Sequence, residues 1–233
     1  DERGRQLKGW TNKLIWGNNS LILSSLINGP MRKEIEDQGG IKLIYIDPPF
    51  DVGDDFQFNI KIENQALLKK RNALEQLAFR DTWGRGADSF LSMIYERLKL
   101  IHNLLAEDGT LYIHCDWRIN SLLRIILDEV FGEKNFLNEI IWHYQSGGRQ
   151  QNLFSRKHDT IYMYSKTKNF NFYIEQVGIP RGKEKRSNLK KNIDEHGKVY
   201  YSIKSAGKIY KYYEDDKVTP ADVWTDISHL QQK

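Results

Sequence analysis

The chain has 233 residues, 39% of them hydrophobic, and a formal net charge of +4. This length and hydrophobic fraction suffice for one large domain, with or without a small second one. No run of about 18 apolar residues is present, so we expect no membrane contact, and the single cysteine, Cys115, excludes an internal disulfide.

The first part of the sequence predicts two strands and two helical segments. A short strand is expected at residues 12–16, followed by a helix that Asn19 caps and that stops at Gly29. The run "IKLIYI" at 41–46 is apolar and β-branched, which is typical of a strand that is covered on both faces. A charged helical piece is expected near 61–79.

The middle of the chain predicts a longer helix and further strands. In "DSFLSMIYERLKLIHNLLAEDG" the apolar residues recur at spacings of three and four, with Asp88 as the expected N-cap and Gly109 as the stop. A strand at 110–114, a helix at 117–132 and a strand at 138–144 follow. This alternation predicts a parallel sheet with helices on both faces.

Charge and aromatic content change near residue 150. Residues 1–150 hold 19 Lys and Arg against 21 Asp and Glu, whereas residues 151–233 hold 16 against 10 and carry 12 of the 28 aromatic residues. We predict a boundary near 145–150 with a small α+β or β-rich module after it. Its cations and rings suit a nucleic-acid contact, and the alternative is a solvated lysine-rich face.

The stretch "DPPF", residues 47–50, follows the buried strand directly. Ligands of open α/β sheets bind beyond the carboxyl ends of the strands, where Asp47 is expected. Pro48 and Pro49 fix the backbone and remove two donors, so that the corner presents a carboxylate, a carbonyl acceptor and the ring of Phe50. These groups suit a planar base with an exocyclic amine, whereas the alternative is an ordinary proline turn.

This motif and its neighbours resemble one family. "DPPF", "LIWGNNSLILSSL", the segment from "DTWGRGADSF" to "ILDEVFG", "NEIIWHY" and "DVWTDI" are similar to motifs of the modification (Mod) subunits of type III restriction–modification systems. The resemblance implies an α/β fold: a Rossmann-like class I methyltransferase sheet, incomplete and in permuted motif order, with an α+β target-recognition module. It places the catalytic domain at 1–146, the recognition domain at 147–221 and a return to the catalytic domain at 222–233.

The resemblance also implies the reaction. It is transfer of a methyl group from S-adenosyl-L-methionine to adenine N6 in DNA, with Asp47, Pro48, Pro49 and Phe50 as the catalytic residues. The base must leave the duplex to be reached. The candidate DNA contacts are Trp83, Arg149, Arg181, Lys183, Lys185, Arg186, Lys190 and Lys191. For Trp83 the alternative is core packing, for Arg149 a plain linker, and for the basic loop a lysine-rich surface.

Asn18, Asn19 and Asp47 are the candidate cofactor residues. Relatives usually carry an acid where this chain has Asn18, and Asn19 could be only a helix cap. No Phe-x-Gly-x-Gly turn for the methionine end of the cofactor is present, so we interpret the chain as an N-terminal fragment with little activity of its own. We expect His114, Cys115 and Asp116 to be structural, and no pattern points to a protein-bound metal.

Other interpretations stay open. The chain could be a DNA-binding specificity module without catalysis, or an enzyme that methylates amino groups in RNA or protein. The family resemblance implies double-stranded DNA and a restriction (Res) subunit as partners, a homodimer in the full-length form, and a DNA-associated protein of the prokaryotic cytoplasm.

Overall fold

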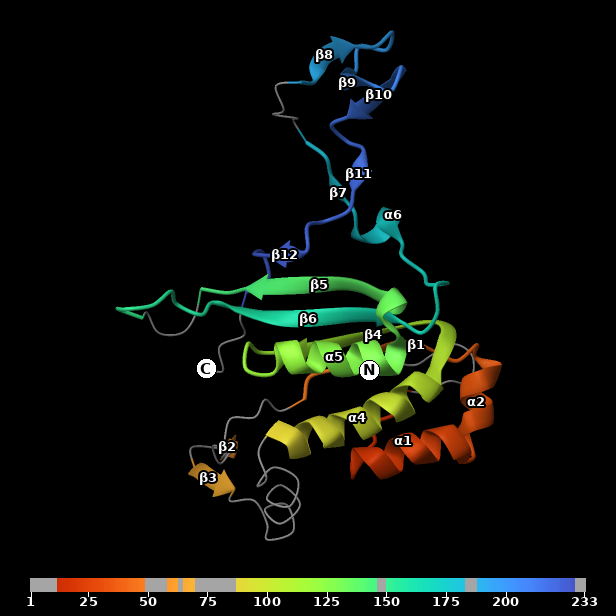
Figure 1. Ribbon diagram of the computed structural model, residues 1–233, viewed down its shortest axis with the longest axis vertical. Coiled ribbons are helices and arrows are strands. Elements are labelled where there is room, and N and C mark those ends of the chain that lie inside the picture. The colour runs from red at the N-terminus through yellow and green to blue at the C-terminus, as the bar shows by residue number, and fades with distance from the viewer. Residues whose placement is uncertain are drawn as a thin grey trace. The chain divides into compact units, whose positions relative to one another are not determined.

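The computed structural model describes residues 12–48, 58–62, 65–69, 87–145, 150–182 and 188–228, with the backbone alone for 58–62, 65–69 and 87–89. The chain divides into two compact units. Unit 1 comprises Asp1–Phe170 and Trp224–Lys233, and unit 2 comprises Asn171–Val223. The two units are described separately below, with the element labels of Figure 1.

Unit 1 is built on a five-stranded mixed sheet (Figure 1). In sheet order its strands are β1 (Ile41–Ile46), β4 (Leu105–Cys115), β6 (His158–Ser165), β5 (Phe136–His143) and β12 (Val223–Trp224). β1 and β4 are parallel, but β6 runs antiparallel to both of its neighbours, β4 and β5. The prediction of a parallel sheet therefore holds for β1 and β4 but was wrong for β6, which enters between β4 and β5 in the reverse direction.

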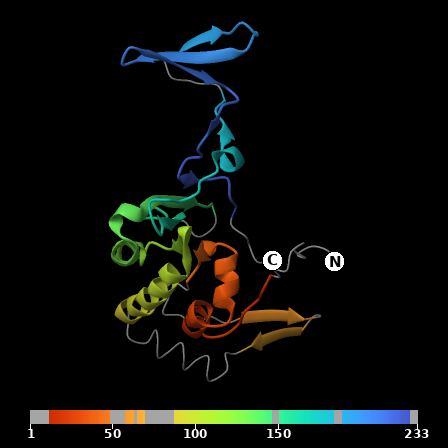
Figure 2. The same ribbon diagram turned by 90° about the vertical axis from the view of Figure 1, so that its right-hand side faces the viewer.

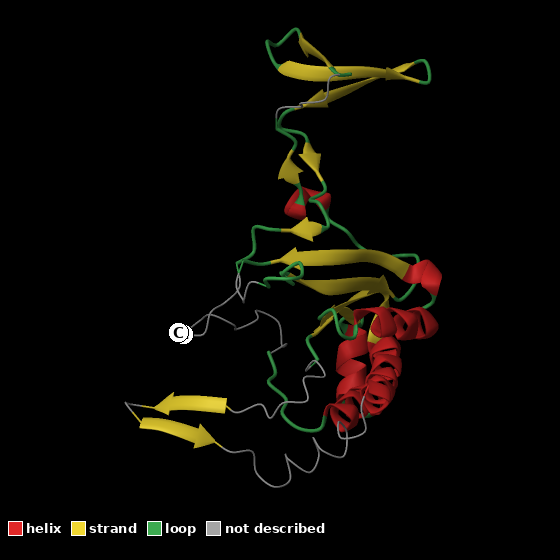
Figure 3. Cartoon of the chain, turned by 60° about the vertical axis from the view of Figure 1, so that its left-hand side comes forward, coloured by secondary structure: helices red, strands yellow, loops and turns green. Residues whose placement is uncertain are grey.

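The helices of unit 1 lie on one face of this sheet (Figure 3). They are α1 (Asn19–Asn28), α2 (Met31–Asp37), α4 (Ala87–Leu104) and α5 (Asn120–Phe131), with a short 3₁₀ helix at Glu133–Asn135. Side chains of α4 and α5 form one apolar core with alternate residues of β4 and β6, including Leu98, Leu123, Leu111 and Tyr164. On the opposite face of β1, Leu43 and Tyr45 are 58% and 56% exposed, so among the described residues the predicted helical cover is present on one face only.

The expected periodicity of α4 is confirmed by burial. Ile94, Leu98 and Ile101 of the expected stripe are at most 4% exposed, and Phe90 rather than Leu91 is its first fully buried residue. The helix ends at Leu104 rather than at Gly109, because the chain enters β4 at Leu105. Gly109 has another role: a Cβ atom there would lie 2.8 Å from the carbonyl oxygen of Ile41, so glycine permits the close approach of β1.

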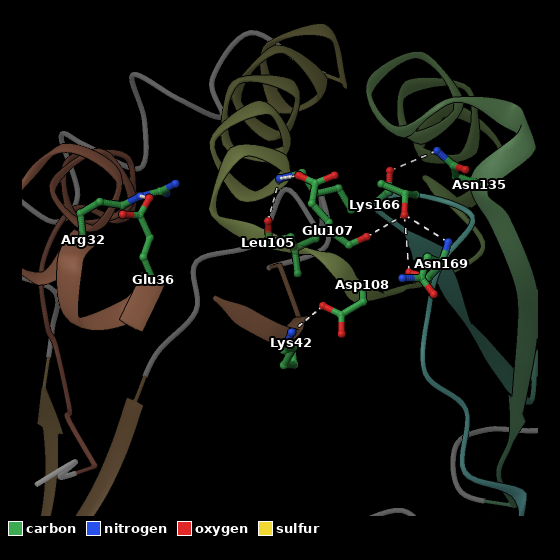
Figure 4. Close-up of polar contacts among 10 residues, drawn as sticks. Arg32, Glu36, Lys42, Leu105, Glu107, Asp108, Asn135, Lys166 and Asn169 are labelled. Atoms are coloured by element: carbon green, nitrogen blue, oxygen red, sulfur yellow. Dashed lines mark hydrogen bonds and ion pairs between the residues drawn. The ribbon is translucent and has the colours of Figure 1, made fainter. Parts of the chain in front are cut away.

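Ion pairs and hydrogen bonds tie the ends of β1, β4 and β6 that lie away from Asp47 (Figure 4). Lys42 Nζ lies 2.5 Å from an Asp108 oxygen, and Lys166 Nζ donates to the Leu105 carbonyl at 2.7 Å and lies 3.0 Å from Glu107 Oε1. The backbone N–H of Lys166 also donates to Gly109. These contacts hold the register of all three strands, because a slip of one residue would break them.

The N-terminal segment differs from its prediction. Residues 12–16 form no strand, and Leu14 and Trp16 are 100% and 89% exposed, because no described strand pairs with them. The N-cap of α1 is Asn18, one residue earlier than expected, and its side chain accepts a hydrogen bond from the Ser20 backbone at 2.9 Å.

Strands replace part of the helix that was predicted near 61–79. β2 (Phe58–Ile62) and β3 (Gln65–Lys69) form an antiparallel hairpin. The apolar residues of "FNIKI" alternate with polar ones, which is the period of a strand and not of a helix. Residues 70–79 lie outside the described residues.

Unit 2 is small and rich in short antiparallel strands (Figure 2). Its elements are α6 (Ile174–Val177), β7 (Ile179–Pro180), β8 (Lys190–Ile193), β9 (Val199–Ser205), β10 (Lys208–Tyr213) and β11 (Lys217–Val218). β9 lies between β8 and β10 in a three-stranded sheet, and β7 pairs with β11. Ala206 and Gly207 join β9 to β10 with φ angles of 49° and 77°, the left-handed backbone that a tight hairpin turn requires.

The first boundary between the units lies after Phe170 rather than after residue 146. β6 accounts for the difference. Its residues Tyr162, Met163 and Tyr164 are at most 7% exposed, as expected of a central strand between two neighbours. The aromatic segment that we assigned to the second module therefore belongs to the main sheet. No helix in the described ranges is long and apolar enough to cross a membrane.

Candidate active site

Asp47 stands at the carboxyl end of β1. Because β1 and β4 are parallel and Ile46 lies opposite Ile113, the next residues, Asp47 and His114, are neighbours at one edge of the sheet. His114 Nδ1 lies 3.0 Å from Asp47 Oδ1. The Asp47 side chain is 57% exposed and open to a ligand, whereas the His114 side chain is 9% exposed.

A second carboxylate lies on the other side of the imidazole. Asp159, in β6, places Oδ2 3.4 Å from His114 Nε2. The hydroxyl of Tyr144 donates to the other oxygen of Asp159 at 3.3 Å, and the Trp142 ring meets the imidazole at a centroid distance of 5.7 Å. Over the described residues, no group of three or more His, Cys, Asp or Glu side chains is arranged to hold a metal ion.

This environment favours the charged imidazolium. Burial by itself lowers the pKa of His114, but the contacts with the Asp159 and Asp47 carboxylates outweigh burial, so the pKa lies above its usual value. The neighbouring Tyr45 also shifts: burial and then the Asp47 charge raise the pKa of its hydroxyl. A histidine protonated near neutral pH can donate from both ring nitrogens, one to each carboxylate.

The structure describes only the first two residues of the "DPPF" motif. Asp47 and Pro48 belong to the described chain, whereas Pro49 and Phe50 lie outside it. The stacking role of Phe50 therefore stays a prediction, and so do the DNA contacts of several residues outside the described ranges: Trp83, Arg149, Lys183, Lys185 and Arg186.

The two candidate cofactor residues at the start of α1 have internal partners. Asn18 Oδ1 accepts from the Ser20 backbone and caps the helix. Asn19 Oδ1 accepts from Arg97 Nε of α4 at 2.9 Å, so it ties two helices together. Each side-chain oxygen already accepts one hydrogen bond, and within the described residues neither amide NH₂ group donates one, so these groups are the donors that the two residues can direct to a ligand.

In unit 2 the two consecutive lysines of β8 point to opposite faces. Lys190 is paired with Ser202, and Lys191 with the buried Tyr201. Side chains of successive strand residues alternate between faces, so one flat partner meets only one of these lysines. Arg181 is partly buried, and its guanidinium stacks 4.5 Å from the centroid of the Tyr212 ring.

A family model described as DNA methylase matches residues 41–233. The chain belongs to this DNA methylase family. It is 28% identical over 208 residues to the Mod subunit of the type III restriction–modification enzyme EcoP15I of Escherichia coli, covering 86% of this chain and 30% of that protein. It is 31% identical over 170 residues to the EcoPI Mod subunit of Escherichia phage P1, covering 69% of this chain and 25% of that protein.

The chain spans about a quarter to a third of the length of these curated relatives. Among solved structures, it is similar to a Thermus thermophilus protein described as a DNA modification methylase, at 14% identity and a TM-score of 0.40. That match covers 69% of this chain and 55% of the crystallised one.

One residue of the candidate site was not expected from the sequence. We expected His114, Cys115 and Asp116 to be structural. Cys115 is fully buried and Asp116 is bound by Arg118 at 2.6 Å, but the imidazole of His114 contacts Asp47. The signal that could have found this contact is the parallel pairing of the two strands, which aligns the residues that follow them. Nothing in the sequence pointed to Asp159.

Proposed function

We propose that this chain forms part of an adenine-N6 DNA methyltransferase, the modification subunit of a restriction–modification system. The observation that carries the proposal is an exposed carboxylate, Asp47, held by a buried histidine at the carboxyl edge of the sheet and followed by "PPF". Membership of the DNA methylase family supports it. The relatives named as type III Mod subunits support the more specific assignment.

Asp47 is the group that would act on the base. Adenine N6 is a weak nucleophile because its lone pair is delocalised into the ring. An accepting carboxylate on one N6 hydrogen, and the Pro48 carbonyl on the other, raise the electron density on nitrogen and direct its lone pair. The Asp47 charge also stabilises the positive charge that develops on nitrogen. Phe50 would hold the ring by stacking.

The proposed methyl donor is S-adenosyl-L-methionine, whose sulfonium supplies a methyl group with a good leaving group. The exposed Asp47 carboxylate fits a cationic donor in the adjoining space. Asn18 and Asn19 would hold the adenosine end through their NH₂ groups, because their oxygens already accept hydrogen bonds.

One face of the sheet in unit 2 is proposed to contact DNA. Cross-strand pairing places Lys190, Ser202 and Lys211 side by side. The same face carries Tyr200 and Tyr213, whose ring centroids are 5.7 Å apart, and Lys211 Nζ lies 4.9 Å from the Tyr200 ring. Lysines for phosphates and tyrosines for stacking on one surface suit nucleic acid.

The remaining family expectations are part of the same proposal. Arg181 and the basic loop with Lys183, Lys185 and Arg186 would contact phosphates, and Trp83 and Arg149 would assist as the adenine leaves the duplex. A restriction subunit as partner, a dimeric assembly and a cytoplasmic location follow from the similarity to type III Mod subunits.

The catalytic part is tested by Asp47→Asn, with Asp108→Asn as the matched control. Asp108 is another aspartate of this sheet, at the opposite end of the same two strands. In the native polypeptide, adenine-N6 methylation measured by mass spectrometry is expected to fall at least about 100-fold in Asp47→Asn, while DNA binding is unchanged. Equal activity of the two variants would refute the role of Asp47.

The cofactor and DNA parts are tested on the 233-residue chain. Calorimetric titration with S-adenosyl-L-methionine measures cofactor binding, and DNA binding without it would favour a specificity module instead. In a salt titration of DNA binding, Lys190→Ala is expected to reduce the slope of log K against log salt by about 1, whereas Lys191→Ala leaves it unchanged. The opposite result would place DNA on the other face.

A further inference from the structure

We propose that His114 is a positioning residue: clamped by Asp159, it holds the Asp47 carboxylate with one oxygen on the imidazole and the other toward the substrate amine. The proposal rests on the proposed function and adds to it two residues that the "DPPF" motif does not contain.

Three adjacent strands bring together Asp47, His114 and Asp159, which we call the clamp. β1 ends just before Asp47, β4 carries His114, and β6 carries Asp159, and these strands are neighbours in the sheet. His114 Nδ1 lies 3.0 Å from Asp47 Oδ1, and its Nε2 lies 3.4 Å from Asp159 Oδ2. Each ring nitrogen therefore faces a carboxylate: Nδ1 lies within hydrogen-bond distance of Asp47, and Nε2 lies within ion-pair distance of Asp159.

The second carboxylate is itself held. Asp159 Oδ1 accepts a hydrogen bond from Tyr144, and its side chain is only 15% exposed. The Trp142 ring approaches the imidazole edge-on at a centroid distance of 5.7 Å, and the Trp142 Nε1–H donates to the carbonyl of Ile227 at 2.9 Å. The exposed fraction of the side chain is 9% for His114 and 57% for Asp47, so the carboxylate that would meet the substrate is the accessible one. A rigid buried support behind an accessible carboxylate is the arrangement that catalytic positioning requires.

The two carboxylates explain why a histidine suits position 114. Among the described residues, the charged groups that face the imidazole are Asp47, directly after β1, and Asp159 in β6, with Tyr144 behind Asp159. One cation between two carboxylates satisfies both, whereas a neutral ring has one N–H and can satisfy only one. An amide side chain in place of His114 keeps one of the two contacts, and its length decides which.

Two isosteric variants separate positioning from packing. The amide nitrogen of Asn occupies roughly the place of Nδ1, and that of Gln the place of Nε2. His114→Asn therefore keeps a donor for Asp47, whereas His114→Gln keeps a donor for Asp159. We expect kcat for adenine methylation to fall about 100-fold in His114→Gln and less than about 10-fold in His114→Asn, with KM for DNA within about twofold in both. Equal kcat loss in the two variants at matched thermal stability, or none in either, overturns the positioning role.

A second measurement does not depend on activity. NMR titration of the His114 imidazole in the 233-residue chain, assigned by the signal that His114→Gln lacks, gives its pKa. We expect Asp47→Asn and Asp159→Asn each to lower this pKa, and Asp108→Asn to leave it unchanged. If neither of the first two variants moves the pKa, the clamp is absent and the proposal fails. If the unmutated native polypeptide methylates no DNA, the proposed function fails, and the titration alone decides for or against the clamp.

Discussion

Replacement of one buried leucine in α5 tests the packing that supports the site. Leu122 and Leu123 are consecutive residues of this helix, 40% and 0% exposed, and Leu123 belongs to the core beneath β4 and β6. Leu123→Ala removes fully buried methyl groups and leaves a cavity, a loss of about 2–5 kcal/mol in the free energy of unfolding. Leu122→Ala loses at most about 1 kcal/mol, because much of that side chain already contacts water.

The comparison uses urea unfolding followed by circular dichroism at the helical minimum. Among the described helices only α6 belongs to unit 2, so the helical signal reports chiefly on unit 1. The two substitutions have the same effect on helix propensity, so their difference, expected to be at least about 1–2 kcal/mol, measures burial alone. Equal losses for the two variants would show that α5 does not present Leu123 to the core.

Three further outcomes are expected. Gly40→Ala lowers the free energy of unfolding by roughly 1–3 kcal/mol, because φ is +80° and the new Cβ would lie 2.9 Å from Ala106 Cβ. Gly207→Ala lowers the free energy of unfolding less in the same urea assay, because Gly207 has a similar φ of +77° but open space around the new Cβ. Cys115 stays unreactive toward a thiol reagent at about pH 8 until urea unfolds the chain, because burial raises its pKa to about 12; rapid labelling of the folded chain contradicts this. Because the pKa of His114 is raised on folding, its stabilising contribution is complete below about pH 6.5 and is lost as pH rises through the folded value. The unfolding free energy of the unmutated chain relative to His114→Gln should therefore fall as pH rises above about 6.5, and a difference that does not change with pH is the contrary outcome.

Local patterns predicted α1, α4 and α5 of unit 1, but not the short helix α2. The stripe of α4, from Phe90 to Ile101, and the amphipathic α5 both depend on interactions between residues three or four apart, which a sequence displays directly. The strand that precedes Asp47 was equally visible, because its apolar run and the prolines that follow it are local features.

Contacts between residues far apart in the chain were harder to predict from the sequence. β6 reads as one more aromatic strand in the sequence, and its place between β4 and β5 depends on pairings that no local pattern encodes. The clamp on Asp47 was missed for the same reason, because Asp159 joins it through β6. Asn18 rather than Asn19 became the cap, which shows that the ends of a helix depend on backbone geometry beyond residue type.

The pairings of the two units differ in how far apart they lie along the chain. In unit 2, a two-residue turn brings β9 and β10 together, whereas the Asp47–His114 contact joins residues 67 positions apart. Closing a long loop has a larger entropic cost, and hairpins form within about 1–10 μs. We therefore expect the β9–β10 hairpin to form early during refolding. The corner with Asp47 assembles only after β1, β4 and β6 have met, so an intermediate can carry the folded lysine and tyrosine surface before it has a competent catalytic carboxylate.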